Sequence, residues 1–352
     1  MRSCFLDDGM QRRQWAIQID DEETMINKDV INRRRALALA VAATMLGAVP
    51  ALAQDFPVKP IRIIVGQAAG GGMDALARVI GAKLADAVKQ AVVVENKVGA
   101  GGIIGTEFVA KAPADGYTLL MGPIGNMVFT PILTPKLRYD VQKDFTPVAL
   151  VATFPLLMMV NSKLPITNVP ELVAYVKANP GKANYGGSGP AFQFATEQFK
   201  IKTQTGGEFI QYKSMSETIT ALISGDLLTA FVDPGPAAVG LADGRLRAIA
   251  VTSPTPFAEL PAVPTMNSVG LPELQMQFWA GLFAPAGTPA AVVKRMEVEI
   301  NRITSLPEMT QRMASIHVQP AFGNSQDLAR LLNDDLLRWR QVARIANIKP
   351  NE

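Results

Sequence analysis

The sequence has few of the side chains that most often catalyse reactions or bind metals. Its 352 residues include one cysteine, Cys4, and one histidine, His317. A lone histidine is expected to be a structural or surface residue, and metal sites need clustered His, Cys or carboxylate ligands. The neighbouring carboxylates Asp334 and Asp335 lie in a charged helical segment, so they are expected on a solvated face. These shortages argue against an unaided hydrolase and against a metal site.

The chain also lacks a marked excess of charge. Its formal net charge is +3, and it contains no cluster of basic residues with interleaved aromatics. Such clusters are typical of nucleic-acid binding. The sequence therefore predicts no nucleic-acid partner.

One apolar run, near the N-terminus, has the features of an export signal. Lys28 and the arginines at 33–35 precede the apolar residues 36–49 and the motif Ala51-Leu52-Ala53. This order is typical of a secretory signal peptide, and the run is too short and Ala-rich for a strong membrane span. We predict a leader over residues 1–53, with the signal peptide at about 25–53. We expect translation to start at Met25, with the upstream part untranslated or disordered; Sec and twin-arginine export both stay open.

Cleavage after Ala53 leaves 299 residues, which is long for one core and suits two domains. The net charge stays +3, because the leader contains seven basic and seven acidic residues. Cys4 lies in the leader, so the mature chain cannot use thiols or disulfides and must be held by its core alone. We expect the product to be soluble outside the cytoplasm.

Strand-like and helix-like segments alternate from residue 61 onward, which predicts an α/β fold with parallel sheets covered by helices. Two apolar stretches, 148–160 and 276–284, are long and are not followed at once by a helix. Strands that cross between two lobes have this pattern. We therefore expect lobe 1 to comprise residues 54–154 plus 278–352, and lobe 2 residues 155–277.

The glycines Gly70, Gly71 and Gly72 lie between a predicted strand and a predicted helix. Backbone amides at a helix N-terminus favour an anion by about 0.3–1 kcal/mol. A phosphate-binding P-loop would need a lysine in G-x-x-x-x-G-K-[ST], and no lysine or arginine lies between residues 66 and 74. Two interpretations stay open: a turn of purely structural role, and a turn whose amides hold a carboxylate or another small polar ligand.

Two further motifs fail as catalytic or cofactor sites. Gly99, Gly101 and Gly105 form G-x-G-x-x-x-G, which is one residue longer than the dinucleotide fingerprint. Ser188 lies in Gly-Gly-Ser-Gly-Pro, whereas the nucleophile elbow G-x-S-x-G requires glycine at position 190. We predict no cofactor and no catalytic site.

Several segments follow a predicted strand and precede a predicted helix. In open α/β sheets, ligands lie outside the carboxyl ends of the strands, and two such lobes can close on a solute. The sequence therefore favours a binding protein over an enzyme. The segments are 122–126, 188–191, 214–216 and 233–236.

An ordered set of motifs extends this hypothesis. In chain order they are FPVKPIRIIV, GGGMDALAR, VVVENKVGAGG, ADGYTLLMG, DFTPVALVA, LRAIAVTS and WAGLFAPAGTP. Over nearly the whole mature chain, the sequence resembles the extracytoplasmic solute-binding proteins of tripartite tricarboxylate transporters, the Bug family. The resemblance implies a two-lobed periplasmic binding protein of type II-like fold, each lobe a mostly parallel sheet flanked by helices, with the ligand cleft between the lobes.

The resemblance also implies a function and a set of site residues. It implies a monomer in the periplasm, without cofactor or catalysis, that captures a small organic carboxylate and delivers it to the membrane permease subunits of the transporter. Ligand carboxylates in the family are held largely by backbone amides and bridging waters. Carried over by position, the ligand-binding residues are Gln67, Gly70, Gly71, Gly72, Met73, Asp74, Gly125, Asn126, Met127, Ser188, Gly189, Pro190, Ala191, Gln193, Tyr212, Asp233 and Trp279.

Several of these positions depart from the family pattern. Gln67 replaces an aromatic residue, Met73 a threonine, Asn126-Met127 a Thr-His pair, and Gln193 a histidine. These changes remove hydroxyl and imidazole groups and add flexible thioethers. They predict a ligand with one carboxylate and an apolar or aromatic body rather than citrate; sequence drift in a cleft that still binds a small dicarboxylate is the alternative.

Two rival functions stay open. The chain could be a ligand-sensing subunit of a signalling system without transport, which neighbouring sensor-kinase genes would favour. An extracytoplasmic enzyme acting on a carboxylate is the weaker rival, because the sequence has no nucleophile-base pair.

Overall fold

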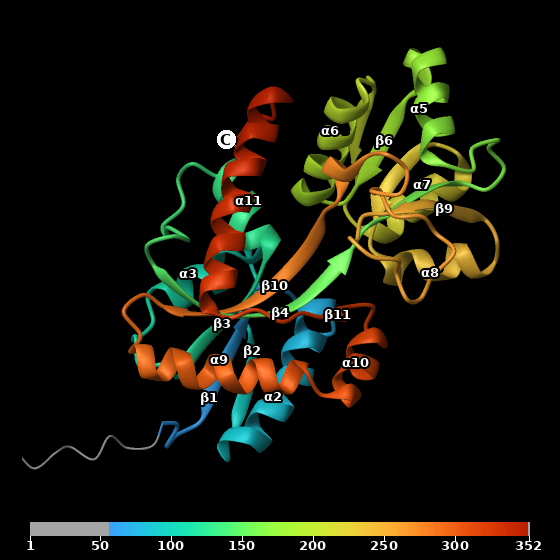
Figure 1. Cartoon of the computed structure of the whole chain (residues 1–352). Coiled ribbons are helices and arrows are strands. Elements are labelled where there is room, and N and C mark those ends of the chain that lie inside the picture. Colours follow the sequence, from blue (N-terminus) through green and yellow to red (C-terminus); the bar gives the residue numbers. More distant parts are fainter. Residues whose placement is uncertain (1–55, 351–352) are drawn as a thin grey trace, which may run out of the picture. The chain divides into compact units, whose positions relative to one another are not determined.

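The computed structural model describes residues 56–350, in which strands and helices alternate (Figure 1). The predicted leader lies outside the described residues. The strands form two sheets, one of six strands and one of five. Within residues 56–350, no helix has both the length and the apolar character needed to cross a membrane.

The first sheet combines parallel and antiparallel strands. β1 pairs in parallel with β2 and β3, whereas β10 pairs antiparallel with β3 and β4, and β11 antiparallel with β4. In spatial order the strands are β11 (Gln319–Pro320), β4 (Phe145–Pro155), β10 (Gln277–Pro285), β3 (Thr118–Pro123), β1 (Ile61–Val65) and β2 (Val92–Asn96).

Helices cover both faces of this sheet, because central strands such as β1 are apolar on both sides. Four of the five residues of β1 are fully buried. Figure 1 shows α2 and α9 on one face and α3 and α11 on the other. The helices of this part of the chain are α2 (Gly72–Val88), α3 (Ile103–Ala110), α4 (Thr130–Leu133), α9 (Ala290–Thr304), α10 (Pro307–Ala314) and α11 (Ser325–Ile345), with a 3-10 turn at Ala100–Gly102 and a π-helical turn at Gly125–Phe129.

The second sheet repeats the strand order of the first. β6 pairs in parallel with β7 and β8, and β5 pairs antiparallel with β8 and β9. Its strands are, in spatial order, β7 (Glu208–Gln211), β6 (Asn184–Gly187), β8 (Thr229–Val232), β5 (Leu157–Asn161) and β9 (Leu246–Val251). Its helices are α5 (Val169–Ala178), α6 (Pro190–Thr203), α7 (Met215–Ser224) and α8 (Pro234–Ala242), with 3-10 turns at Pro180–Lys182 and Pro272–Leu274.

The chain passes between the sheets twice. It leaves the first sheet at the end of β4 and enters the second at β5, and it returns after β9 through β10. β4 and β10 lie side by side along their whole length, from Gln277 opposite Pro155 to Pro285 opposite Phe145 (Figure 1).

The predicted α/β fold with two sheets is confirmed, but the expected mostly parallel pairing is wrong. Both sheets are mixed, since five strands pair only antiparallel: β4, β5, β9, β10 and β11. The physical reason lies in the crossings: a strand that leaves a sheet and a strand that returns to it run in opposite directions, so neighbours of this kind must pair antiparallel.

An aromatic cluster joins α6 to α11. Phe194 of α6 contacts Trp339 of α11 with ring centroids 5.8 Å apart, and Phe129 lies 5.0 Å from Phe194 and 5.2 Å from Trp339. All three rings are buried. Each such pair contributes roughly 0.5–1.5 kcal/mol beyond the area that it buries.

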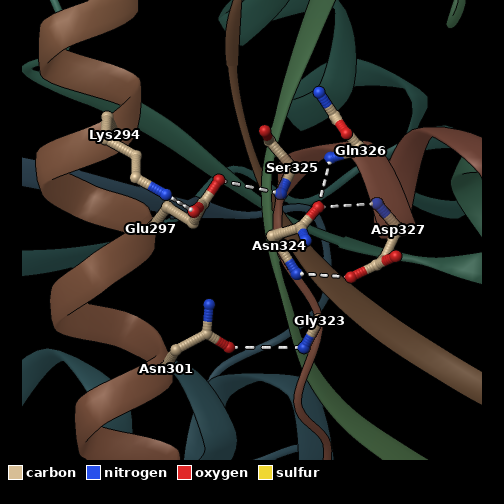
Figure 2. Close-up of polar contacts among 8 residues, drawn as sticks. All are labelled: Lys294, Glu297, Asn301, Gly323, Asn324, Ser325, Gln326 and Asp327. Carbon is tan, nitrogen blue, oxygen red and sulfur yellow. Dashed lines mark hydrogen bonds and ion pairs between the residues drawn. The ribbon is translucent and has the colours of Figure 1, made fainter.

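Side chains satisfy the amides at the start of α11 (Figure 2). Asn324 accepts hydrogen bonds from the amides of Gln326 at 2.8 Å and Asp327 at 3.0 Å, and the Asp327 carboxylate accepts from the Asn324 amide at 3.1 Å. Glu297 of α9 accepts from the Ser325 amide at 3.0 Å. This capping box leaves no first-turn amide of α11 open to an added anion.

Candidate functional site

A cavity of about 600 Å³ lies at the carboxyl ends of β1, β3, β6 and β8. In both sheets these strands are the adjacent parallel pair at which the strand order reverses, which is where open α/β sheets bind ligands. The volume suits a small-molecule ligand. Eleven of the predicted site residues line the cavity: Gln67, Gly71, Gly72, Met73, Gly125, Asn126, Ser188, Gly189, Pro190, Ala191 and Asp233.

Three helices begin at the wall of this cavity without a side-chain cap. They are α2, α6 and α8, whose N-cap residues are Gly71, Gly189 and Asp233. By contrast, α5, α7 and α11 are capped by asparagine or serine; Figure 2 shows the cap of α11. α3, α9 and α10 also lack a side-chain cap, and α4 continues directly from the π-helical turn. The cavity is therefore distinguished by the convergence of three uncapped helices that start there. First-turn amides have no partner within their helix, and with the helix dipole they favour an anion. α8 contributes the fewest such amides, because Pro234 and Pro236 have no amide hydrogen.

The glycine turn at the start of α2 is held by Asp74. The Asp74 carboxylate accepts a hydrogen bond from the Gly70 amide at 2.9 Å, and Arg78 donates to it from Nε at 3.0 Å. These hydrogen bonds, that of Arg78 first, lower the pKa of Asp74 to about 2. Asp74 therefore shapes the turn and leaves the next amides, those of Gly72 and Met73, at the cavity wall.

A chain of amide hydrogen bonds connects the first two loops. Gln67 Nε2 donates to Asn126 Oδ1 at 2.8 Å, and Asn126 Nδ2 donates to the Gly101 carbonyl at 2.7 Å. Asn96 Nδ2 donates to the Gln67 carbonyl at 3.1 Å. Because its nitrogen is engaged, the remaining polar atom of the Gln67 side chain is Oε1, which is buried without a hydrogen-bond partner.

Asp233 carries the negative charge of the cavity wall. Within residues 56–350, the lining includes no lysine or arginine, and its other titratable residue is His317. The Asp233 side chain is half-buried by accessible surface, yet protein surrounds it closely enough that loss of hydration raises its pKa to about 6. The cavity thus combines anion-favouring amides with one carboxylate.

Four phenylalanines form an apolar wall. Phe278 of β10 is central: its ring centroid lies 5.9 Å from Phe129, 6.4 Å from Phe154 and 5.9 Å from Phe192. All four line the cavity. They come from the π-helical turn, β4, α6 and β10, which are far apart in the sequence. The wall therefore exists only in the folded chain.

His317 lies where the two sheets face each other across the cavity. It follows α10 in the first part of the chain, and its Nδ1 is 2.9 Å from Glu259 Oε2, in the loop after β9 of the second sheet. Its ring also packs against Gly235 at the start of α8. His317 therefore bridges the two sides of the cavity wall.

The described part of the chain contains no group of three or more His, Cys, Asp or Glu side chains placed to hold a metal ion.

Comparisons with known proteins identify the family of the chain. Residues 76–348 match the family model described as tripartite tricarboxylate transporter family receptor. The chain belongs to this family. It is 32% identical to Protein BugT of Bordetella pertussis over 91% of this chain and 99% of BugT.

Solved structures share the fold. Rpa4515 from R. palustris with adipate is 31% identical, with a TM-score of 0.73 over 84% of this chain and 100% of that chain. MatC from Rhodopseudomonas palustris with bound malate is 28% identical, with a TM-score of 0.68 over 82% of this chain and 99% of that chain. The predicted resemblance to tripartite tricarboxylate transporter receptors is confirmed, as is the two-lobed periplasmic binding fold.

Six of the positions carried over from the receptor family do not line the cavity: Gly70, Asp74, Met127, Gln193, Tyr212 and Trp279. Gly70 and Asp74 bond to each other within the turn. Met127 is fully buried in the π-helical turn. Gln193 follows the lining residue Phe192 on α6, where one residue turns the side chain by about 100° away.

Strand geometry explains the other two. Tyr212 follows β7, the edge strand of the second sheet, so it lies in a separate depression with Ser216 and Glu217. Successive residues of a strand point to opposite faces, so Phe278 faces the cavity and Trp279 faces away. Trp279 is buried, and its Nε1 donates to Asp335 Oδ2 at 2.7 Å. The expected solvated face for Asp335 is therefore wrong, whereas Asp334 is exposed.

Sequence reasoning missed the four phenylalanines of the apolar wall and the place of His317. Phe154 and Phe278 lie in the two strands predicted to cross between the lobes. Because the predicted ligand site lies between the lobes, these strands could have indicated both residues as lining residues. His317 carried no such signal, because its place depends on a turn with a left-handed backbone, φ 58°, between two elements that were not predicted, α10 and β11.

Proposed function

We propose that the protein is a periplasmic solute receptor that captures a small organic carboxylate with an apolar or aromatic body. The convergence of three uncapped helix N-termini on a cavity with a phenylalanine wall carries the proposal. The solved structures of Rpa4515 with adipate and MatC with bound malate support a carboxylate as the ligand class.

Helix amides are the anion-binding groups that the cavity offers. Two successive amides at the start of α2 belong to Gly72 and Met73, and two at the start of α6 belong to Ala191 and Phe192. A carboxylate can accept hydrogen bonds from such amides directly or through water. The absence of lysine and arginine from the described lining favours one carboxylate over three.

The body of the ligand is expected to lie against the phenylalanine wall. Phe129, Phe154, Phe192 and Phe278 present apolar surface from both sides of the cavity. Burial of a ligand against it gains about 25 cal/mol per Å² of apolar area. Citrate, with three carboxylates and little apolar surface, would gain little from this wall.

The wider assignment follows from the family. We infer that residues 54–154 plus 278–352 and residues 155–277 act as two lobes that close on the ligand. The receptor then presents the ligand to the membrane permease subunits of a tripartite transporter. It acts in the periplasm as a monomer and needs no cofactor.

Thermal unfolding with a panel of carboxylates tests the ligand class. The panel includes 3-phenylpropionate, adipate, malate and citrate. Since a ligand that binds only the folded state raises the unfolding temperature, we expect 3-phenylpropionate or a related aromatic carboxylate to stabilise the protein more than citrate does. Stabilisation by citrate alone would refute the apolar body, and no stabilisation by any carboxylate would refute the function.

Gly72→Leu tests the place of binding. A Cβ added at Gly72 meets no atom within 4 Å, so the leucine side chain can enter the cavity without disturbing the fold. We expect it to abolish ligand binding measured by calorimetry while leaving urea unfolding unchanged. Gly181→Leu is the matched control, because a Cβ at Gly181 also meets no atom within 4 Å and this residue lies outside the cavity lining. Unchanged affinity in Gly72→Leu would contradict the site.

A further inference from the structure

Asp233 occupies a helix-cap position without acting as a cap. It follows β8 and precedes α8, and its side chain makes no hydrogen bond to the first turn of that helix. Pro234 and Pro236 occupy the first and third positions of α8 and have no amide hydrogen to donate. Within residues 56–350, neither a hydrogen bond nor an ion pair neutralises this carboxylate, and the one cause that shifts its pKa is desolvation.

A half-buried carboxylate without a donor costs free energy, because water solvates it poorly and no protein group replaces that water. Asp233 lines the cavity, where a ligand can reach it. The wall thus contains amide donors for an anion and, separately, one carboxylate that calls for a donor.

The charges of the lining decide between ligand classes. His317 is engaged with Glu259 through Nδ1, and the described lining contains neither lysine nor arginine. A ligand that is only an anion would add negative charge beside Asp233 and leave its carboxylate unpaired. A ligand with a carboxylate and a hydrogen-bond donor would satisfy the amides and Asp233 together.

We propose that Asp233 is a specificity-determining residue that accepts a hydrogen bond from an ammonium or hydroxyl group of the ligand, so that the receptor selects carboxylates bearing such a donor. The inference rests on the proposed function and names the ligand class of that site. Ligand selection then depends on Asp233 as well as on the helix amides.

Calorimetry with matched ligands tests this assignment. 3-Phenylpropionate is the parent, and its 2-hydroxy, 2-ammonium (phenylalanine) and 4-hydroxyphenyl derivatives add one donor each; adipate and malate complete the panel. A hydrogen bond to a charged group is worth about 1.5–3 kcal/mol, so we expect at least one donor-bearing derivative to bind about tenfold or more tightly than the parent.

Two variants separate charge from hydrogen bonding. Asp233→Ala removes the acceptor, and we expect it to reduce the preference for the donor to less than about threefold. Asp233→Asn keeps a neutral oxygen acceptor, so an advantage that comes from an ammonium group is lost and one that comes from a hydroxyl group is partly kept. Asp86→Asn, an exposed carboxylate on α2 outside the lining, is the control and should change no affinity. Urea unfolding verifies that each variant is folded.

Each outcome of these experiments supports or refutes the inference about Asp233. If the parent binds as tightly as every derivative, or if the preference for the donor persists in Asp233→Ala, the inference is refuted and the proposed function stands. Adipate or malate could instead bind more tightly than every donor-bearing aromatic compound. If Asp233→Ala then changes that affinity no more than Asp86→Asn does, the inference is refuted too. If no compound binds the wild-type protein, the proposed function itself fails.

Discussion

Asp74 links the stability of the glycine turn to pH. Its carboxylate is 3% exposed and receives the Gly70 amide and the Arg78 guanidinium. Asp74→Asn removes the charge and keeps one oxygen for the Gly70 amide. We expect this variant to be less stable at pH 7 and to bind the ligand within about threefold of the wild-type affinity, because Asp74 does not line the cavity.

The magnitude follows from the pKa of Asp74. A shift from 3.8 to about 2 corresponds to about 2.4 kcal/mol at 1.36 kcal/mol per pH unit. Since the side chain of Arg78 is 53% exposed, solvent screening reduces the expected loss to about 1–2 kcal/mol. The folded-state pKa is lowered, so this stability is present above pH 3.8 and is lost as the pH falls towards 2, with about half remaining at pH 3.

Urea unfolding of the wild type and Asp74→Asn between pH 7 and pH 3 measures this difference. Asp86→Asn on the same helix is the matched control and should follow the wild type at every pH. Asp74→Ala also removes the oxygen that holds Gly70, so we expect it to weaken ligand binding where Asp74→Asn does not. A stability difference that is absent at pH 7, or that is as large at pH 3 as at pH 7, would refute the reasoning.

Three further predictions concern the cavity and its surroundings. Desolvation raises the pKa of Asp233 from 3.8 to about 6, so ionisation increasingly disfavours the folded state between pH 3.8 and 6 and does so fully above pH 6. Asp233→Asn should therefore be more stable than the wild type by up to about 3 kcal/mol at pH 7.5 in urea unfolding, and equal to it below pH 4. His317→Ala should release ligand up to about fivefold faster in stopped-flow fluorescence, since it removes a partly exposed contact to Glu259 worth about 0.2–1 kcal/mol. If His317→Ala has the same effect in a Glu259→Gln background, the contact is not the cause. Trp279→Phe should cost about 1–3 kcal/mol of stability, because it leaves Asp335 without its buried donor, whereas calorimetry should find ligand affinity unchanged; weaker binding would instead place Trp279 beside the ligand.

Local sequence patterns predicted most elements of the fold. The sequence pattern predicts a helix over 290–304 and a strand over 246–251, and these match α9 and β9. It also predicts a helix capped by Asn168, and Asn168 caps α5. These elements have strong local signals: apolar periodicity, a capping residue and flanking prolines or glycines. α10 and β11 were missed, because a two-residue strand and a helix with few buried residues leave little pattern.

The predicted strand ends correctly located most of the lining residues, but they did not predict the contacts of these residues. Gly71, Ser188 and Asp233 follow strands that the sequence reveals, and parallel strands bring their carboxyl ends to one edge. The segment 214–216 also follows a strand, yet it lies outside the lining. Sequence alone does not tell that β7 is an edge strand, which is a property of the strand order.

The sequence by itself determined the alternating α/β elements, the glycine turn without a basic residue, and the family, because each depends on neighbours within a few residues or on ordered motifs. Only the tertiary structure decided that Phe278 rather than Trp279 faces the cavity, that Asp335 is buried, and that His317 reaches Glu259 at 2.9 Å. These facts depend on strand register and on contacts between segments far apart in the chain, where a shift of one residue turns a side chain to the opposite face.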